Sequence, residues 1–320
     1  MPFKHVLQKF NAAIKEVVIG TGDAALTLGG ENVLPLYSFD GPIRNPPRVG
    51  IEFSDLGPNR ELPGIAAFYA GAETLADVAK RAAEKSGASF VSLSLDGADP
   101  NGKNKSIEEC VALCKEVADA VTLPLVIQGC KNVEKDGKLF EKIAEALQGK
   151  NVLLMSAREE NYKAVAVAAV MAYGQKISAE SSVDINLAKQ LNVLISQLGV
   201  TAGNTVMNLG SAAAGYGFEY VASTMDRVKS AALAQNDAML QLPVITPVGA
   251  EAWSVKEAVV SEEDFPEWGP VEQRGIDMEI ATAAADIAAG SNAVILRHPV
   301  SVSAITKLIS ELIQGANHGA

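Results

Sequence analysis

The residues of this sequence that could bind a ligand are mostly amides, hydroxyls and glycines, and few are suited to acid–base or nucleophilic chemistry. Most lie at or just beyond the end of a short apolar run, where a buried strand would stop. Amide and hydroxyl groups hold large polar ligands through scattered hydrogen bonds. We therefore predict a binding site with no catalytic residue and no metal ligand. The candidate residues are Asp96, Asp99, Gln128, Ser156, Ser181, Asn208, Gly210, Ser211, Gly215, Tyr216, Gly217 and Arg297.

The stretch 210–217 carries almost no side-chain bulk before Tyr216. Its glycines, Gly210, Gly215 and Gly217, permit backbone conformations that other residues resist. Such a segment is either an ordinary flexible connection between a strand and a helix, or a place where a large ligand approaches the backbone. Its position after a predicted strand favours a role in contact and spacing.

Several of these candidates also have a structural interpretation. Asp96 and Asp99 precede Gly or Pro, where aspartates commonly cap turns. Asn208 could satisfy backbone groups of the loop that follows it, and Arg297 with His298 could pair with carboxylates beside the last helix. Both interpretations are open from the residues alone.

The stretch 251–275 holds Trp253 and Trp268, which are the only tryptophans, together with Phe265. In a chain that is 5% aromatic, this clustering indicates either a contact surface or a loop packed on its own aromatic residues.

The sequence lacks the residues that three familiar kinds of site require. A Schiff-base aldolase needs a desolvated lysine, and Lys131 is the only lysine close to a predicted strand end. A metallohydrolase needs clustered histidines and carboxylates, and only His298 is placed for this. A phosphate site would need glycine-rich turns after the last strands, where Gly249 stands almost alone.

The cysteines do not match a metal or iron–sulfur site. There are 3 of them, too few for a four-thiolate centre, and their spacing fits none of the usual patterns. We expect buried, reduced thiols at Cys110, Cys114 and Cys130.

Composition limits the class of protein. A hydrophobic fraction of 48% and a charged fraction of 20% are typical of a globular protein. The net charge of −11 argues against binding nucleic acid or an anionic membrane surface. No stretch reaches about 18 consecutive apolar residues, and the first residues lack the apolar core of a signal peptide. We expect a cytoplasmic protein with no membrane partner.

Eight short apolar runs alternate with helical stretches from about residue 46 onward, and this alternation predicts an α/β fold. Eight regular units favour a closed (β/α)8 TIM barrel over 46–320, with a doubly wound open sheet as the alternative. Residues 1–45 form a predicted N-terminal helix and hairpin arm, whose β-hairpin at 17–28 we expect to cover the bottom of the barrel. The predicted strands are 49–53, 90–95, 124–127, 151–155, 176–179, 205–209, 243–247 and 292–296.

Several motifs resemble a known family when taken together and in order. They include Leu-Asp-Gly-Ala-Asp-Pro at 95–100 and Gly-Tyr-Gly-Phe-Glu-Tyr at 215–220. The others are 129–136, 184–195, 243–253 and 297–299. With these motifs the chain resembles the small subunit of the corrinoid/iron–sulfur protein, which is the delta subunit of the acetyl-CoA decarbonylase/synthase complex.

The resemblance implies a TIM-barrel subunit paired with a large subunit that carries a [4Fe–4S] cluster and a corrinoid domain. The corrinoid (cobalamin) would lie between that domain and the barrel mouth. The pair would carry a methyl group from methyltetrahydrofolate, through a separate methyltransferase, to acetyl-CoA synthase/CO dehydrogenase. This is the anaerobic Wood–Ljungdahl pathway of carbon fixation, and the subunit would be non-catalytic or co-catalytic.

The residues agree with two parts of that description. Three scattered cysteines cannot hold the cluster, and the chain has no Asp-x-His-x-x-Gly pattern that would supply a cobalt ligand. A competing hypothesis is a free-standing pterin-dependent methyltransferase, in which Asp96 and Asn208 would bind the pterin. A barrel enzyme acting on another small molecule is a third.

Overall fold

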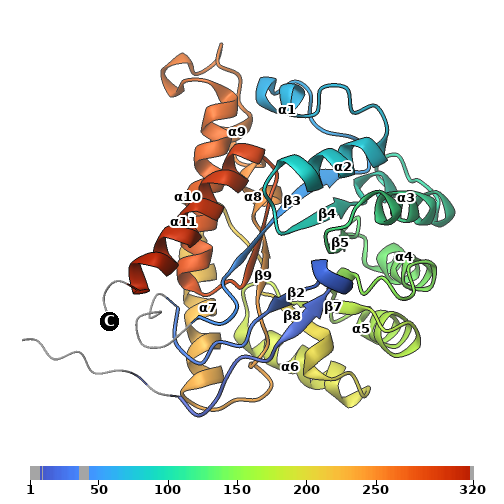
Figure 1. The fold of residues 1–320 in the computed structure, drawn as a ribbon, viewed down its shortest axis with the longest axis vertical. Helices are drawn as coiled ribbons and strands as arrows, with labels where there is room; N and C mark the ends of the chain where they lie inside the picture. Colours follow the sequence, from blue (N-terminus) through green and yellow to red (C-terminus); the bar gives the residue numbers. More distant parts are fainter. Residues whose placement is uncertain (1–7, 9, 36–42, 318–320) are drawn as a thin grey trace, which may run out of the picture.

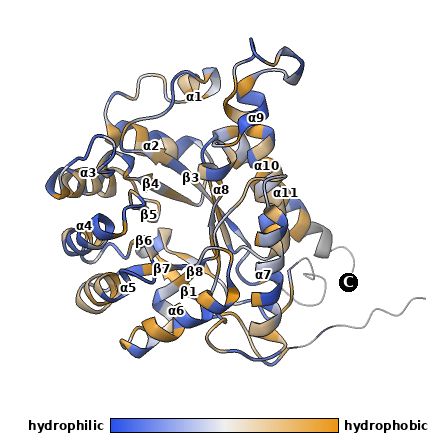
Figure 2. Ribbon diagram, turned by 180° about the vertical axis from the view of Figure 1, so that it is seen from behind, coloured by the Kyte–Doolittle hydropathy of each residue, from blue (hydrophilic) through white to orange (hydrophobic). Residues whose placement is uncertain are grey.

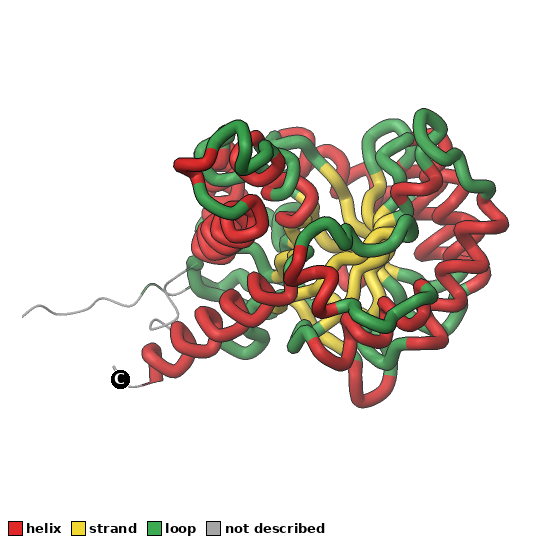
Figure 3. Tube along the Cα trace, turned by 90° about the horizontal axis from the view of Figure 1, so that it is seen from above, coloured by secondary structure: helices red, strands yellow, loops and turns green. Residues whose placement is uncertain are grey.

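The computed structural model describes residues 8, 10–35 and 43–317. Its centre is an eight-stranded parallel sheet in the order β8-β7-β6-β5-β4-β3-β10-β9. A parallel bridge between Met207 and Val244 joins the two ends of the sheet into a barrel. Figure 3 shows the strands gathered in the centre with helices around them. The predicted (β/α)8 TIM barrel is confirmed, and the open-sheet alternative is not.

All eight predicted strands are present. They are β3 (Arg48–Ser54), β4 (Phe90–Ser94), β5 (Leu125–Gln128), β6 (Leu153–Ala157), β7 (Lys176–Glu180), β8 (Thr205–Asn208), β9 (Ile245–Pro247) and β10 (Ala293–Leu296). Every neighbouring pair is parallel. The carboxyl ends of the strands therefore meet at one end of the barrel, which is the end where such folds place their sites.

The helices pack on the outside of the barrel. They are α1 (Pro63–Phe68), α2 (Leu75–Lys85), α3 (Ile107–Ala120), α4 (Val133–Ala146), α5 (Tyr162–Val165), α6 (Ile185–Gln197), α7 (Phe218–Leu233), α8 (Val248–Ala252), α9 (Lys256–Val259), α10 (Val271–Ala289) and α11 (Pro299–Asn317). Several of the longer ones, such as α2 and α4, are amphipathic (Figure 2). A π-helix, Ala166–Ala172, continues α5.

A capping box begins α3. Ser106 accepts a hydrogen bond from the backbone of Glu109, and the Glu109 carboxylate accepts one from the backbone of Ser106. Asp184 caps α6 in a similar way, and Pro299 is the first residue of α11. These local signals fix where the helices begin.

Removing the side chain of Ser106 tests how much this cap stabilises the fold. The substitution Ser106→Ala leaves the backbone N–H of Glu109, in the first turn, without its side-chain partner. We expect it to lower the free energy of unfolding by about 1 kcal/mol. Urea denaturation of the wild type and the variant measures the difference, and equal midpoints would contradict the assignment.

The predicted hairpin is confirmed at the bottom of the barrel. Strands β1 (Val17–Ile19) and β2 (Leu26–Leu28) pair antiparallel. Their buried side chains form one apolar cluster with Phe90, Val126, Leu153 and Val206 from the barrel interior. The Asn151 side chain donates hydrogen bonds to the carbonyl oxygens of Val18 and Gly20. The hairpin therefore closes the end of the barrel opposite the carboxyl ends of the strands.

The helix predicted within 1–45 has no counterpart among the described residues, where a 3-10 turn, Gly22–Ala24, is the only helical element of that arm. Residues 1–7 and 9 lie outside the described residues. The division of the chain at residue 45 stays a prediction.

A buried ion pair ties the arm to the barrel. The Lys229 side chain of α7, 1% exposed, lies 2.7 Å from a carboxylate oxygen of Glu31 and also donates to Asn292. Burial by itself raises the pKa of Glu31, but Lys229 and Asn292 lower it below its ordinary value.

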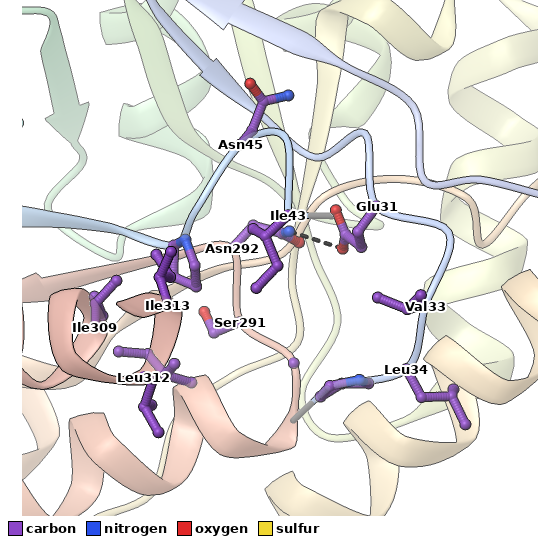
Figure 4. Close-up of a pocket in the computed structure, with 14 residues that line it drawn as sticks. Glu31, Val33, Leu34, Ile43, Asn45, Ser291, Asn292, Ile309, Leu312 and Ile313 are labelled. Carbon is purple, nitrogen blue, oxygen red and sulfur yellow. Dashed lines mark hydrogen bonds between the residues drawn. The ribbon is translucent and has the colours of Figure 1, made fainter. Parts of the chain in front are cut away.

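Figure 4 shows Glu31 beside a small cavity of about 130 Å³, lined mostly by apolar side chains of the arm and α11. This cavity lies at the amino ends of the strands, the end that mainly serves stability.

Candidate functional site

A cavity of about 400 Å³ opens at the carboxyl ends of the strands, and we call it the central cavity. It is lined by side chains that end or follow β3 to β10, mixing charged, amide and hydroxyl groups with small residues. Its lining includes Glu52, Asp96, Gln128, Lys131, Asp136, Ser156, Arg158, Glu180, Ser182, Asn208, Gly210, Ser211, Glu251 and Arg297. The strand order alone brings together residues separated by up to 245 positions in the chain.

The structure places the predicted binding residues in two groups. Those that line the central cavity are Asp96, Gln128, Ser156, Asn208, Gly210, Ser211 and Arg297. Those that do not line it are Asp99, Ser181, Gly215, Tyr216 and Gly217. The first group surrounds the cavity, and the glycines of the second lie just beyond Ser211 on the same loop.

A buried acid forms the floor of the cavity. Glu52, 4% exposed, accepts hydrogen bonds from Arg297 at 2.8 and 3.2 Å and from Gln128 at 2.7 Å. Burial by itself lowers the pKa of Arg297, but the carboxylate of Glu52 raises this pKa above its ordinary value. The backbone N–H of Arg297 is held by Glu279, a buried acid of α10 whose own pKa is raised by its burial. Arg297 is thus held through its guanidinium by Glu52 and through its backbone by Glu279.

Hydroxyl and amide groups complete the wall. Asp96 accepts hydrogen bonds from Ser54 and Ser94, both at 2.6 Å. On the other side of the cavity, the Asn208 side-chain amide donates to Ser156 at 3.4 Å and to Glu180 at 3.3 Å. These contacts fix the positions of hydroxyl and amide groups around the cavity.

The loop 210–217 is held in place rather than free. The backbone N–H of Gly210 donates to the Asn208 side chain at 3.0 Å, and that of Ala214 donates to Thr282 of α10 at 2.9 Å. The buried Ser211 hydroxyl has no hydrogen-bond partner within the described part of the chain. Gly215 has φ +84°, and a Cβ built on it would meet no described atom within 4 Å. The loop therefore presents an unpaired hydroxyl and an open stretch of backbone.

Some predicted residues have a local structural role. Asp99 accepts a hydrogen bond from the backbone of Asn101 at 2.9 Å, which is the turn-capping alternative. Ser181 is 1% exposed and lies below the surface, whereas its neighbour Ser182 lines the cavity. Tyr216 is 48% exposed and donates from its hydroxyl to Glu257.

The residue-based prediction missed several charged side chains of the cavity, chiefly Glu52, Arg158 and Glu180. Arg158 and Glu180 form an ion pair of 2.6 Å across the ends of β6 and β7. Glu52 lies in the middle of β3, between apolar neighbours, and not at the strand end. A charged residue inside an apolar strand is a signal for an inward-facing polar group, and it would have identified Glu52.

The cysteines are buried and unpaired, as predicted. Burial raises the pKa of Cys130 to about 11, so this thiol beside the cavity is protonated at neutral pH. Among the described residues, no group of three or more His, Cys, Asp and Glu side chains is placed to hold a metal ion. No described helix is both long and apolar enough to span a membrane.

His298 is a structural residue next to the site. It is 1% exposed, its Nε2 lies 3.2 Å from Glu272, and its Nδ1 accepts a hydrogen bond from the backbone of Val300. It also stacks on Trp253 with 6.0 Å between ring centroids. Burial lowers the pKa of His298 by more than Glu272 raises it. The predicted pairing of Arg297 and His298 with carboxylates is confirmed.

This shift predicts a pH dependence of stability. Because the folded pKa lies below the ordinary 6.5, the unfolded chain binds the proton first as the pH falls. The contribution of neutral His298 to the free energy of unfolding is therefore complete above pH 6.5 and is lost as the pH falls below that value. The free energy of unfolding then falls by at most about 1.4 kcal/mol per pH unit. We expect His298→Asn to show a shallower loss of unfolding free energy between pH 7.5 and 5.5 than the wild type. Parallel curves in urea titrations would contradict this.

Comparison with known proteins agrees with the fold. A dihydropteroate synthase of Xanthomonas albilineans, solved with 4-aminobenzoic acid, superposes with a TM-score of 0.53 at 13% identity, covering 94% of this chain and 99% of that one. A truncated 3-deoxy-D-arabino-heptulosonate 7-phosphate synthase of Thermotoga maritima gives 0.53 at 12% identity, over 94% and 97%. At these identities the likeness shows the barrel fold alone.

Sequence comparison identifies the family. The model of the CO dehydrogenase/acetyl-CoA synthase delta subunit matches residues 16–292. The acetyl-CoA decarbonylase/synthase complex subunit delta of Archaeoglobus fulgidus is 31% identical, over 97% of this chain and 71% of its own length. The subunit delta 1 of Methanosarcina thermophila is also 31% identical, over 97% and 73%. The chain therefore belongs to the family of the CO dehydrogenase/acetyl-CoA synthase delta subunit.

Proposed function

We propose that this chain is the small subunit of a heterodimeric corrinoid/iron–sulfur methyl carrier and that its barrel mouth covers a corrinoid held by a large subunit. The observation that carries the proposal is the central cavity, with amide and hydroxyl groups among its charged lining and the open loop 210–217 beside it. A corrinoid is a flat macrocycle whose edge carries amide side chains. Such a ligand needs scattered hydrogen-bond partners and close approach to backbone.

The size of the cavity supports a shared site. A volume of about 400 Å³ accepts amide side chains or one face of the ring but does not enclose a whole corrinoid. The remaining surface of the ligand then needs a second protein. The unpaired Ser211 hydroxyl and the clear space at Gly215 are the local features that fit one edge of it.

In this proposal the chain's own residues bind and orient. Gln128, Ser156, Asn208 and Ser211 would hold the amide side chains, and the loop 210–217 would exclude water from the covered face. When bound, the corrinoid supplies a cobalt centre that accepts and gives up a methyl group. His298 is buried against Glu272 and is not available as a cobalt ligand.

The partners follow from the same proposal. The three buried cysteines are too few for a [4Fe–4S] cluster, so the large subunit would carry it. A methyltetrahydrofolate methyltransferase would donate the methyl group, and acetyl-CoA synthase/CO dehydrogenase would accept it, in the cytoplasm. The subunit would act without a catalytic residue of its own.

One experiment separates this function from that of a free-standing pterin-dependent methyltransferase. The chain is expressed alone and together with the large subunit, and both preparations are assayed for corrinoid absorbance and methyl transfer. We expect corrinoid only in the co-expressed pair and no methyl transfer by the isolated chain. Transfer from methyltetrahydrofolate to free cobalamin by the isolated chain would overturn the proposal.

A further inference from the structure

A second cavity of about 880 Å³ opens beside the central one, and we call it the side cavity. Its walls are the loop from β3 to α1 on one side and the segment around α9 on the other. In Figures 1 and 2, α1 and α9 project from the same side of the molecule. Glu52, Asp96 and Arg297 line both cavities, so the two share one mouth.

The side cavity is strongly acidic. Six carboxylates line it against one guanidinium, that of Arg297; the acids are Glu52, Glu61, Asp96, Glu262, Glu263 and Glu272. Glu52, Asp96 and Glu272 are engaged in the contacts described above. Glu61 and Glu263, on opposite walls, are exposed, and their carboxylates have no ion pair or hydrogen bond within the described ranges. Two exposed carboxylates without partners in the lining of one cavity favour a cationic occupant.

The rest of the wall includes apolar side chains and a buried tyrosine hydroxyl without a partner. Leu62 and Trp253 line it, and Val259 leaves 56% of its surface exposed. Tyr69 also contributes to the wall, with 1% exposure, and its hydroxyl has no hydrogen-bond partner among the residues that the structure describes. A buried hydroxyl without a partner is costly, so an acceptor supplied from outside would stabilise it.

Other occupants fit this lining less well. The acids are not grouped closely enough to hold a metal ion, as far as the described residues show. An anion would be repelled by the carboxylates. The cavity offers carboxylates, apolar side chains and the unpaired hydroxyl of Tyr69. A lysine or arginine within a polypeptide matches these with its positive head, its apolar stem and a nearby backbone carbonyl.

We propose that the side cavity receives a lysine- or arginine-bearing segment of the large subunit. The inference rests on the proposed function, since the large subunit would then lie over the adjoining central cavity. The cationic head lies between Glu61 and Glu263, its stem packs on Trp253 and Val259, and a backbone carbonyl of the segment accepts from Tyr69. This contact fixes the orientation of the two subunits at the shared mouth.

Charge reversal at the rim tests the proposal in the assembled pair. We expect Glu61→Lys/Glu263→Lys to weaken binding of the large subunit at least about tenfold at low salt, with a smaller effect at high salt. The control is Glu159→Lys/Glu160→Lys, which makes the same charge change at exposed positions at the same end of the barrel, outside both cavities. Equal affinities for the two variants would overturn the inference, whereas a wild-type chain that binds no large subunit would overturn the proposed function instead.

Removing the hydroxyl of Tyr69 is a second test, because it should not destabilise the isolated chain but should weaken binding of the large subunit. Because it has no partner in the isolated chain, Tyr69→Phe should leave the stability of that chain unchanged or higher. In the pair we expect a loss of affinity of about two- to tenfold. Titration of the large subunit with each chain measures this, and an unchanged affinity would contradict the contact.

Discussion

Replacing Gly215 with leucine is expected to reduce corrinoid retention by the assembled pair at least about tenfold, the equivalent of about 1.4 kcal/mol. An added Cβ points into open space beside the central cavity, so the leucine side chain fits the isolated subunit but occupies the space assigned to the ligand. The left-handed φ of +84° adds backbone strain of about 1–2 kcal/mol. Absorbance of the corrinoid after gel filtration measures retention.

The control for this strain is Gly149→Leu. Gly149 has φ +85° and equally open space, but it precedes β6 at the opposite end of the barrel. Both variants should lose the same amount of unfolding free energy, and only Gly215→Leu should lose corrinoid. If the two variants keep equal corrinoid, the loop 210–217 is a structural connection only.

Replacing Arg297 with alanine is expected to lower the free energy of unfolding by about 2–4 kcal/mol. The substitution leaves the Glu52 carboxylate, 4% exposed, with Gln128 as its remaining partner at the floor of the cavity. Because the Arg297 side chain keeps 38% exposure, the loss is smaller than for a fully enclosed pair. Urea denaturation at neutral pH measures it.

Two controls identify the origin of that loss. The double variant Glu52→Gln/Arg297→Met removes both charges and should recover most of the lost stability, because no uncompensated carboxylate is left. Lys307→Ala breaks an ion pair on the surface, where both side chains are more than half exposed, and should change little. An Arg297→Ala variant as stable as Lys307→Ala would show that Glu52 is not held by this pair.

The fold was predictable from the sequence because its signals are local. Apolar runs, the Ser106 capping box and Pro299 each identify an element through contacts within a few residues. Eight alternating units then leave few arrangements other than a closed barrel. The same reasoning identified the hairpin at 17–28 and the end of the barrel that would hold a site.

The individual site residues were less predictable, because neighbouring residues at a strand end face different directions. Ser181 and Ser182 follow β7 directly and are chemically identical, yet only Ser182 lines the cavity. Glu52 was missed because it lies within a strand, where an apolar residue is expected. Its partner Gln128 ends β5 and its partner Arg297 follows β10, and only the barrel geometry brings them together.

The position of the corrinoid in the assembled pair tests the central claim most directly. A crystal or cryo-electron microscopy structure of the co-expressed, corrinoid-loaded pair would measure it. We predict the ring at the mouth of this barrel, with an amide side chain within hydrogen-bond distance of Ser211 and the backbone of Gly215 against the ring edge. A corrinoid enclosed by the large subunit alone, out of contact with the central cavity, would contradict the account.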